Sequence, residues 1–300
     1  MQDYRTPMQN SLLWVYEGQT TFWGIVLAAR SGLVSREDTL ADLANLAASL
    51  DNRAGRAWRP LVDTTNEPII GYHAPQAWTS WQRSVDYYNE GMLLWLDVDS
   101  LIRNLSGGAR SLDDFAHGFF GVREGDWGEL TYTRDDVIRE LNRVQPYDWA
   151  GYLRERVDET TPHPPLDGLA RGGYKLVYTD TPTEWFKSLE KRRKVSDLSY
   201  SGGLVLGREG EVSGVQWDSP AFDAGLTVGT RIVAVNGRAY DIDDLKETIK
   251  SKRSPISLLV RTGDIFRTVE FSYDGGLRYP KLERTGTGPS SLDALLAPKP

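Results

Sequence analysis

An acidic residue lies inside the first apolar segment of this sequence. Residues 14–20 read Trp-Val-Tyr-Glu-Gly-Gln-Thr, which puts Glu17 within a strongly apolar stretch from Leu12 to Ala29. A carboxylate is one of the groups that bind zinc, and a catalytic zinc ion is held by three protein ligands and a water molecule. Taken alone, an acid on an apolar helix is more often a hydrogen-bonded structural carboxylate than a metal ligand.

The histidines of the sequence are too widely spaced to complete such a site. They are His73, His117 and His163, and none lies four residues from another. Two imidazoles bind one zinc ion from one face of a helix when they are four residues apart. We therefore expect Glu17 to hold zinc weakly or not at all. His73 falls on a predicted loop, where an exposed or hydrogen-bonded histidine is more common than a substrate contact, and we assign it no role.

The elements that would position these residues are mainly helical up to about residue 160. Helical patterns cover residues 12–29, 35–50, 77–104, 111–119, 133–144 and 147–157. Ser35 followed by Asp38 begins the second of them with a capping pattern, and its leucines then recur at helical spacing. The third is expected to break near Tyr88. From Gly172, beyond the proline-rich stretch at 161–165, the pattern becomes strand-like.

A second pattern lies between residues 200 and 273. Tyr-Ser-Gly-Gly-Leu-Val-Leu begins at Tyr200, a short Ser-Pro-Ala helix begins at Ser219, and residues 229–237 read Gly-Thr-Arg-Ile-Val-Ala-Val-Asn-Gly. The final Asn-Gly pair is typical of a two-residue hairpin turn. In this order the segments resemble a PDZ domain of the bacterial kind.

That resemblance implies a groove between a strand and a helix, in which an extended peptide adds to the strand edge and its terminal carboxylate meets backbone amides. The expected groove residues are Gly202, Gly203, Leu204, Val205 and Leu206 on the strand side, with Leu245 and Ile249 on the helix. The partners implied are the C-termini of peptides or proteins. The alternative is that this domain only packs on its neighbour and binds nothing.

The order of all these segments, over nearly all of positions 1–280, is similar to the glycyl aminopeptidase family of gluzincin zinc metallopeptidases. The resemblance implies that Glu17 is the third zinc ligand. It also implies that Tyr88, three residues before Gly91, donates to the oxyanion of the tetrahedral intermediate, with Tyr87 in reserve. A Tyr-Tyr pair without this context is more often core packing. The intact family enzyme prefers N-terminal Gly or Ala.

We therefore expect a multidomain α and β protein, with the α-helical C-terminal half of a thermolysin-like catalytic domain followed by a PDZ-like β domain. The predicted divisions are 1–160 for the helical part with a helical extension, 161–195 for a linker with a short strand and a helix, 196–276 for the PDZ-like domain and 277–300 for a flexible tail. Because the His-Glu-x-x-His helix is missing from the sequence, we expect an inactive portion of a bacterial zinc aminopeptidase that binds no zinc tightly. The alternative is a non-enzymatic peptide-binding or scaffold protein.

Composition limits the other partners. Lys and Arg number 35 against 42 Asp and Glu, a net charge of -7, so nucleic acid is not an expected partner. No apolar run approaches the roughly 18 residues that span a bilayer, so we expect a soluble chain, in the cytoplasm or the periplasm. A half-domain would expose apolar faces of the 12–29 helix, and we expect self-association or rearranged N-terminal packing to cover them.

Overall fold

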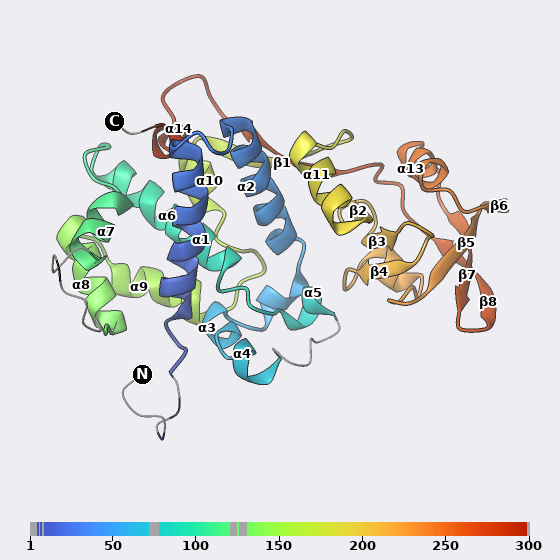
Figure 1. The fold of residues 1–300 in the computed structure, drawn as a ribbon, viewed down its shortest axis with the longest axis horizontal. Helices are drawn as coiled ribbons and strands as arrows, with labels where there is room; N and C mark the ends of the chain where they lie inside the picture. The colour runs from blue at the N-terminus through green and yellow to red at the C-terminus, as the bar shows by residue number, and fades with distance from the viewer. Residues whose placement is uncertain are drawn as a thin grey trace.

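The described residues fold into a mainly helical part and a part rich in strands (Figure 1), and each part has its own hydrophobic core. The computed structural model describes residues 5, 7, 9–71, 78–120, 125 and 131–298. The helical core is built from residues between 14 and 174 together with residues 282–296, and the second core from residues between 198 and 271. The protein is therefore a mixed α and β structure with two packed parts.

The helical part carries most of the helices. They are α1 (Leu13–Arg30), α2 (Arg36–Asp51), the 3-10 helix η1 (Ala54–Ala57), α3 (Leu61–Thr64), α4 (Glu67–Ile70), α5 (Thr79–Gln82), α6 (Asn89–Leu105), α7 (Leu112–Phe120), α8 (Arg134–Val144), α9 (Trp149–Leu153), the π-helix η2 (Arg154–Asp158), α10 (Asp167–Arg171) and α14 (Ser291–Leu296). Helix α11 (Glu184–Arg193) connects the two parts, and α12 (Pro220–Asp223) and α13 (Ile242–Lys250) belong to the second. No helix among the described residues is long and apolar enough to cross a bilayer.

Over the part of the chain that the structure describes, the strands form three antiparallel sheets. They are β1 (Tyr174–Thr179), β2 (Val195–Leu198), β3 (Leu204–Gly207), β4 (Val212–Val215), β5 (Arg231–Val235), β6 (Arg238–Ala239), β7 (Ile256–Thr262), β8 (Ile265–Phe271) and β9 (Tyr279–Arg284). The sheet orders are β2-β3-β4, β6-β5-β7-β8 and β1-β9. Asn236 and Gly237 have φ angles of 49° and 78°, so the predicted Asn-Gly turn joins β5 to β6.

The helix predicted over 77–104 is divided in the structure. Residue 77 lies outside the described residues, α5 ends at Gln82, and α6 begins at Asn89, directly after Tyr88. Arg83 between them has a φ of 62°, a left-handed conformation that interrupts an α-helix. This interruption leaves Tyr88 at the N-terminal end of α6.

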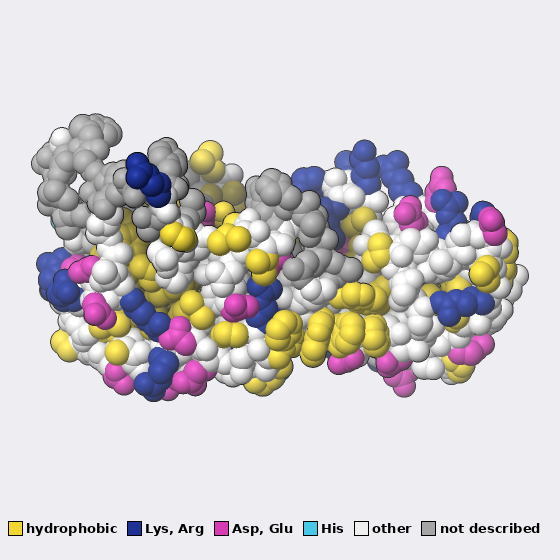
Figure 2. All heavy atoms as spheres, turned by 90° about the horizontal axis from the view of Figure 1, so that it is seen from below, with side chains coloured by type: hydrophobic (Ala, Val, Ile, Leu, Met, Phe, Trp, Pro, Cys, Tyr) yellow, Lys and Arg dark blue, Asp and Glu magenta, His cyan; other side chains and the backbone are white. Residues whose placement is uncertain are grey.

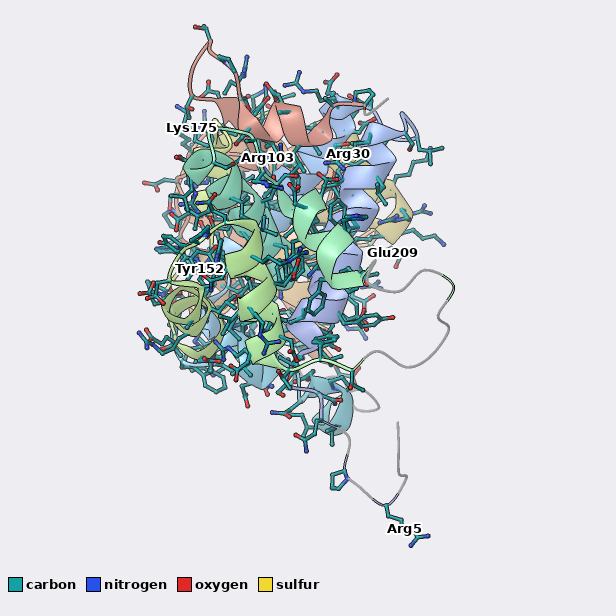
Figure 3. The ribbon with its side chains drawn as sticks, turned by 90° about the vertical axis from the view of Figure 1, so that its left-hand side faces the viewer. Arg5, Arg30, Arg103, Tyr152, Lys175 and Glu209 are labelled. Atoms are coloured by element: carbon teal, nitrogen blue, oxygen red, sulfur yellow. The ribbon has the colours of Figure 1, made fainter. Side chains whose placement is uncertain are left out.

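The last residues are not a flexible tail, and this prediction is wrong. Strand β9 pairs with β1, and α14 packs into the helical core with Leu292, Leu295 and Leu296 at most 4% exposed. Arg30 of α1 donates to the carbonyl of Leu295 at 2.8 Å, and Figure 3 shows Arg30 beside α14. The Gly- and Pro-rich composition concealed a set of leucines that the distant helical core buries.

Helix α1 buries most of its apolar side chains within the helical part. Trp14, Val15, Phe22 and Val26 are at most 2% exposed, because α6 and its neighbours cover them. Among its large side chains, Tyr16 and Leu27 remain exposed. Self-association of the chain stays a prediction.

Candidate active site

The two residues that the sequence singles out for chemistry meet in the structure. The hydroxyl of Tyr88 donates a hydrogen bond to Oε1 of Glu17 over 2.8 Å, although the residues lie 71 positions apart. Both side chains are half-buried, so the pair lies at the border between core and solvent. Tyr87 is buried in the helical core, with its ring centroid 4.8 Å from that of Tyr88. Of the two tyrosines, Tyr88 therefore reaches the acid.

Two glycines set the distance between the helices that carry this pair. A Cβ atom on Gly18 of α1 would lie 2.9 Å from the backbone of Gly91 on α6, and one on Gly91 would lie 2.9 Å from Cα of Gly18. Backbones approach this closely only where neither residue has a side chain. Since Glu17 adjoins one glycine and Tyr88 lies three residues before the other, the helix crossing brings their side chains together.

A pair of tryptophans, each one helical turn from a crossing glycine, stabilises the crossing of α1 and α6. The indole rings of Trp14 and Trp95 stack with centroids 5.9 Å apart, and Nε1 of Trp95 donates to the carbonyl of Trp14 over 3.0 Å. Both tryptophans are at most 1% exposed. This buried contact fixes the rotation of α1 against α6, and with it the direction in which Glu17 points.

A network of buried charges holds the segment that leads into Tyr88. Arg83, Asp86 and Glu90 are each at most 5% exposed. Nε of Arg83 lies 2.8 Å from Asp86, and its Nη2 contacts Glu90. Arg53 reaches Asp86 over 2.6 Å, and Arg56 lies 3.0 Å from Glu90. Each buried carboxylate therefore has two guanidinium partners.

The network has a structural consequence for Tyr88. Burial by itself raises the pKa of Asp86, but Arg53 and Arg83 outweigh it and hold that pKa below its ordinary value. Breaking one buried partner would leave a charge without compensation, which is strongly destabilising. The segment from Arg83 to Glu90, left-handed at its first residue, is thus held in one conformation, and Tyr88 lies within it.

The family of this region follows from a comparison with known families. Residues 1–94 match the model of the M61 glycyl aminopeptidases. Residues 1–94 belong to the M61 aminopeptidase family. Glu17, Tyr88, both crossing glycines and the charge network all lie inside the M61 segment. The aminopeptidase family that the sequence predicts is confirmed.

Solved structures extend the comparison over the whole chain. An aminopeptidase N family protein from Idiomarina loihiensis matches with a TM-score of 0.76 and 18% identity, which shows a shared fold. The match covers 99% of this chain and 50% of that protein, so this chain spans about half its length. The HtrA3 PDZ domain bound to a phage-derived ligand (FGRWV) matches 37% of this chain and 91% of its own, at 25% identity and a TM-score of 0.20, which is too low to support a conclusion about the fold. A comparison with curated proteins found no match.

The donor groups that the structure describes in the M61 segment do not fit a three-ligand zinc site. Within the described residues, no group of three or more His, Asp or Glu side chains could hold a metal ion. His163 is exposed and its Nδ1 lies 2.8 Å from Asp51, and His117 is exposed on α7. His73 lies outside the described residues. Glu17 therefore has a phenol for a partner here, and the described histidines are engaged elsewhere or exposed.

The residues predicted to form a peptide groove lie together in the second part. Leu204, Leu206, Leu245 and Ile249 are fully buried in one core, and Gly202 and Gly203 have φ angles of 106° and 91°. Gly203 donates its amide to the carbonyl of Leu198 over 3.2 Å. Val205 points to the other face of the sheet.

The edge of β3 that was expected to accept a peptide strand is already paired. Strand β3 lies between β4 and β2, so both of its edges carry a neighbour. The two left-handed glycines allow the chain to turn directly from β2 into β3, which explains this hairpin. A peptide-binding role for these residues stays a prediction.

An aromatic cluster at the junction of the two parts was not foreseen. Its members are Trp58, Trp78, Trp81, Trp217 and Phe222. Rings of Trp81 and Trp217 stack 5.1 Å apart, and the Trp217 amide donates to Ser80 over 3.0 Å. Figure 2 shows hydrophobic side chains gathered over this junction. The tryptophan-rich composition was the available signal, but it could not pair residues from two distant segments.

Val205 lines a polar cleft at this junction, with a volume of about 650 Å³. Its walls come from α2 and α5 on one side and from β2, β3 and β4 on the other. Arg53 and Arg193 on its walls each have a carboxylate partner, Asp86 and Asp197. The cleft is therefore lined mainly by neutral hydrogen-bonding groups and by paired charges.

Proposed function

We propose that this chain supplies two functional groups of an M61-type aminopeptidase and is catalytically incomplete by itself. Glu17 corresponds to the family's third zinc ligand and Tyr88 to its oxyanion donor. The observation that carries the proposal is the 2.8 Å hydrogen bond between them, made across a glycine crossing inside the family-matched residues. The family implies hydrolysis of the first peptide bond of substrates with N-terminal Gly or Ala.

The finer fold assignment belongs to the same proposal. Residues 1–160 are assigned to the helical C-terminal half of a thermolysin-like catalytic domain, and residues 196–276 to a PDZ-like domain. The two separate hydrophobic cores support this division. Zinc dependence is proposed for the intact family enzyme only, because the donor set described above does not fit zinc.

Tyr88 is suited to donate a hydrogen bond to developing negative charge. Its hydroxyl already donates to a carboxylate, and the buried charge network fixes the backbone that carries it. A donor held in place before reaction needs little reorganisation, which is the basis of oxyanion stabilisation. To serve a substrate, the hydroxyl has to exchange Glu17 for the oxyanion, a small rotation about the side chain.

A peptidase assay with the purified full chain and added zinc tests the proposal. With glycine and alanine amide substrates, we expect no turnover above that of the Glu17→Ala variant. Glu37→Gln is the matched control, since Glu37 is an exposed acid on the neighbouring helix α2. The proposal that the chain is catalytically incomplete would be wrong if zinc-dependent turnover were observed. That turnover would have to be abolished by a chelator and by Glu17→Ala, and to persist in Glu37→Gln.

A non-enzymatic peptide-binding protein is the second candidate. It is favoured by the misfit of the donor set around Glu17 and by the buried leucine and isoleucine side chains of the second core. Saturable binding of a peptide with a free hydrophobic C-terminus, unchanged in Glu17→Ala and accompanied by no turnover, would favour this candidate.

A further inference from the structure

Strand β2 lies where an added peptide strand would lie. It pairs antiparallel with β3 in the register Val195↔Gly207, Ser196↔Leu206, Asp197↔Val205 and Leu198↔Leu204. Its C-terminal end meets the loop with Gly202 and Gly203, which is the end where a bound peptide presents its carboxylate. The antiparallel direction of β2 and its place at the edge of β3 are those expected of an added peptide strand.

The last residue of β2 makes the contacts of a terminal residue. The side chain of Leu198 is fully buried in the second core, together with Leu204, Leu245 and Ile249. Its carbonyl oxygen accepts from the amides of Ser201 at 2.9 Å and Gly203 at 3.2 Å. The loop amides that could hold a carboxylate are therefore used by the chain itself.

Ser196 of β2 also lies near the beginning of α13. Side chains two residues apart in a strand share a face, so Ser196 points to the same side as Leu198. Ser196 and Ile242, the first residue of α13, line a common hollow of about 230 Å³. Strand β2 thus pairs with β3 and borders a hollow that the first residue of α13 also lines.

Contacts from outside the second core hold β2 in position. Asp197 pairs with Arg193 at 2.8 Å, and its amide donates to Glu190 of α11 at 2.7 Å. Asn52, the residue that follows α2 in the helical part, donates to the carbonyl of Ser199 at 3.1 Å. Strand β2 is therefore held in place partly by residues of α11 and of the helical part, so a conformational change of the helical part could release it.

We propose that residues 195–198 are an internal ligand of the PDZ-like groove, and that an external peptide binds only by replacing them. This inference rests on the proposed peptide-binding function of the second part. The external peptide has the pattern of β2 itself, a small hydroxyl residue two positions before a C-terminal leucine. Since a covalently attached strand competes at millimolar or higher effective concentration, the intact chain binds such a peptide weakly.

Three variants of the full chain separate the states of β2. Leu198→Ala opens the buried pocket for an external leucine, and Asn52→Ala weakens the hold on β2 without touching the groove. Asp197→Cys with Val205→Cys clamps β2 onto β3, in a chain that has no other cysteine. The Asp197 amide points away from β3 to Glu190, so this is a non-hydrogen-bonded pair, with a typical Cα separation of about 4.5 Å that suits a disulfide.

The probe is a fluorescein-labelled Val-Ser-Asp-Leu peptide with a free carboxylate, and its C-terminal amide is the control. By fluorescence anisotropy we expect affinity at least roughly tenfold higher for Leu198→Ala than for the intact chain, and roughly fivefold higher for Asn52→Ala, as expected for losing one buried contact or one hydrogen bond. The oxidised clamp should bind no peptide, and reduction should restore the binding of the clamped chain.

Hydrogen exchange of the β3 amides reports whether β2 has left. If the intact chain and the oxidised clamp bind the peptide equally, β2 is not an internal ligand, although the second part still binds peptides. Absence of binding in Leu198→Ala with unprotected β3 amides would overturn peptide binding itself. If Leu198→Ala and Asn52→Ala bind no peptide and their β3 amides stay protected, β2 does not leave the sheet, and this result also contradicts the inference.

Discussion

At the scale of single residues, the Glu17–Tyr88 hydrogen bond is a contact between a carboxylate and a phenol at the edge of a core. Such a bond contributes to stability because its donor and acceptor are partly withdrawn from water, and both side chains are only half-buried. The same geometry therefore serves packing and the proposed chemistry. A measured coupling energy distinguishes this bond from chance proximity.

A double-mutant cycle with Tyr88→Phe and Glu17→Ala should give a coupling of about 1 kcal/mol in urea unfolding, because both partners of one hydrogen bond are removed. Tyr16→Phe, an exposed tyrosine on the same helix, is the control and should change the free energy of unfolding by less than about 0.5 kcal/mol. Additive single effects would mean that the hydroxyl and the carboxylate do not interact in solution.

At the scale of elements, the crossing of α1 and α6 decides where the candidate residues lie. Glycine is a poor helix former, and the presence of Gly18 in α1 and of Gly91 in α6 is explained by the backbone contact between the two helices. The stacked Trp14 and Trp95 then prevent rotation about that contact. The pair Glu17 and Tyr88 depends on a helix-packing feature rather than on local sequence.

Gly91→Ala should destabilise the protein by about 1–3 kcal/mol, because the new Cβ would lie 2.9 Å from Cα of Gly18 and force the helices apart. Gly24→Ala on α1 is the matched control, since its Cβ would meet nothing within 4 Å. Higher helix propensity should leave that variant unchanged or stabilise it by up to about 1 kcal/mol. If thermal unfolding ranks the two variants equally, the close crossing is wrong.

At the scale of the whole molecule, two separate stretches of the chain contribute to the helical part. The chain leaves this part through β1 and α11, forms the second core, and returns through β9 and α14 (Figure 1). The returning segment closes the helical core with leucines and also ties the two parts together. The aromatic cluster around Trp81 and Trp217 forms a second connection between them.

Truncation after Gly276 should therefore unfold the helical part, because it removes β9 and the buried face of α14. Leu295→Ala is a milder version and should cost about 2–5 kcal/mol, as for other fully buried leucines. Truncation after Leu296 is the control, because Ala297 and Pro298 are exposed. If truncation after Gly276 leaves the circular dichroism spectrum and the unfolding transition unchanged, the prediction of a flexible tail over 277–300 would be correct after all.

Local pattern was enough to predict the Asn236–Gly237 turn and to reveal a resemblance to the glycyl aminopeptidase family, and that resemblance suggested Glu17 and Tyr88 as candidate residues. Each of these depends on residue types at short spacing, and a turn or a motif keeps its conformation in many surroundings. The cap at Ser35 was predictable for the same reason, and its hydroxyl accepts from the amide of Asp38.

Only the tertiary structure decided which distant segments meet. The left-handed Arg83 that ends α5 lies among buried carboxylates contributed by later residues, which no local propensity predicts. Strand β2 occupies the edge of β3, and α14 fills the helical core, because each buries apolar side chains against partners far along the chain or beyond a turn. Burial is a property of the assembled fold, so composition alone described the residues of α14 as a flexible tail and did not show that β2 pairs with β3.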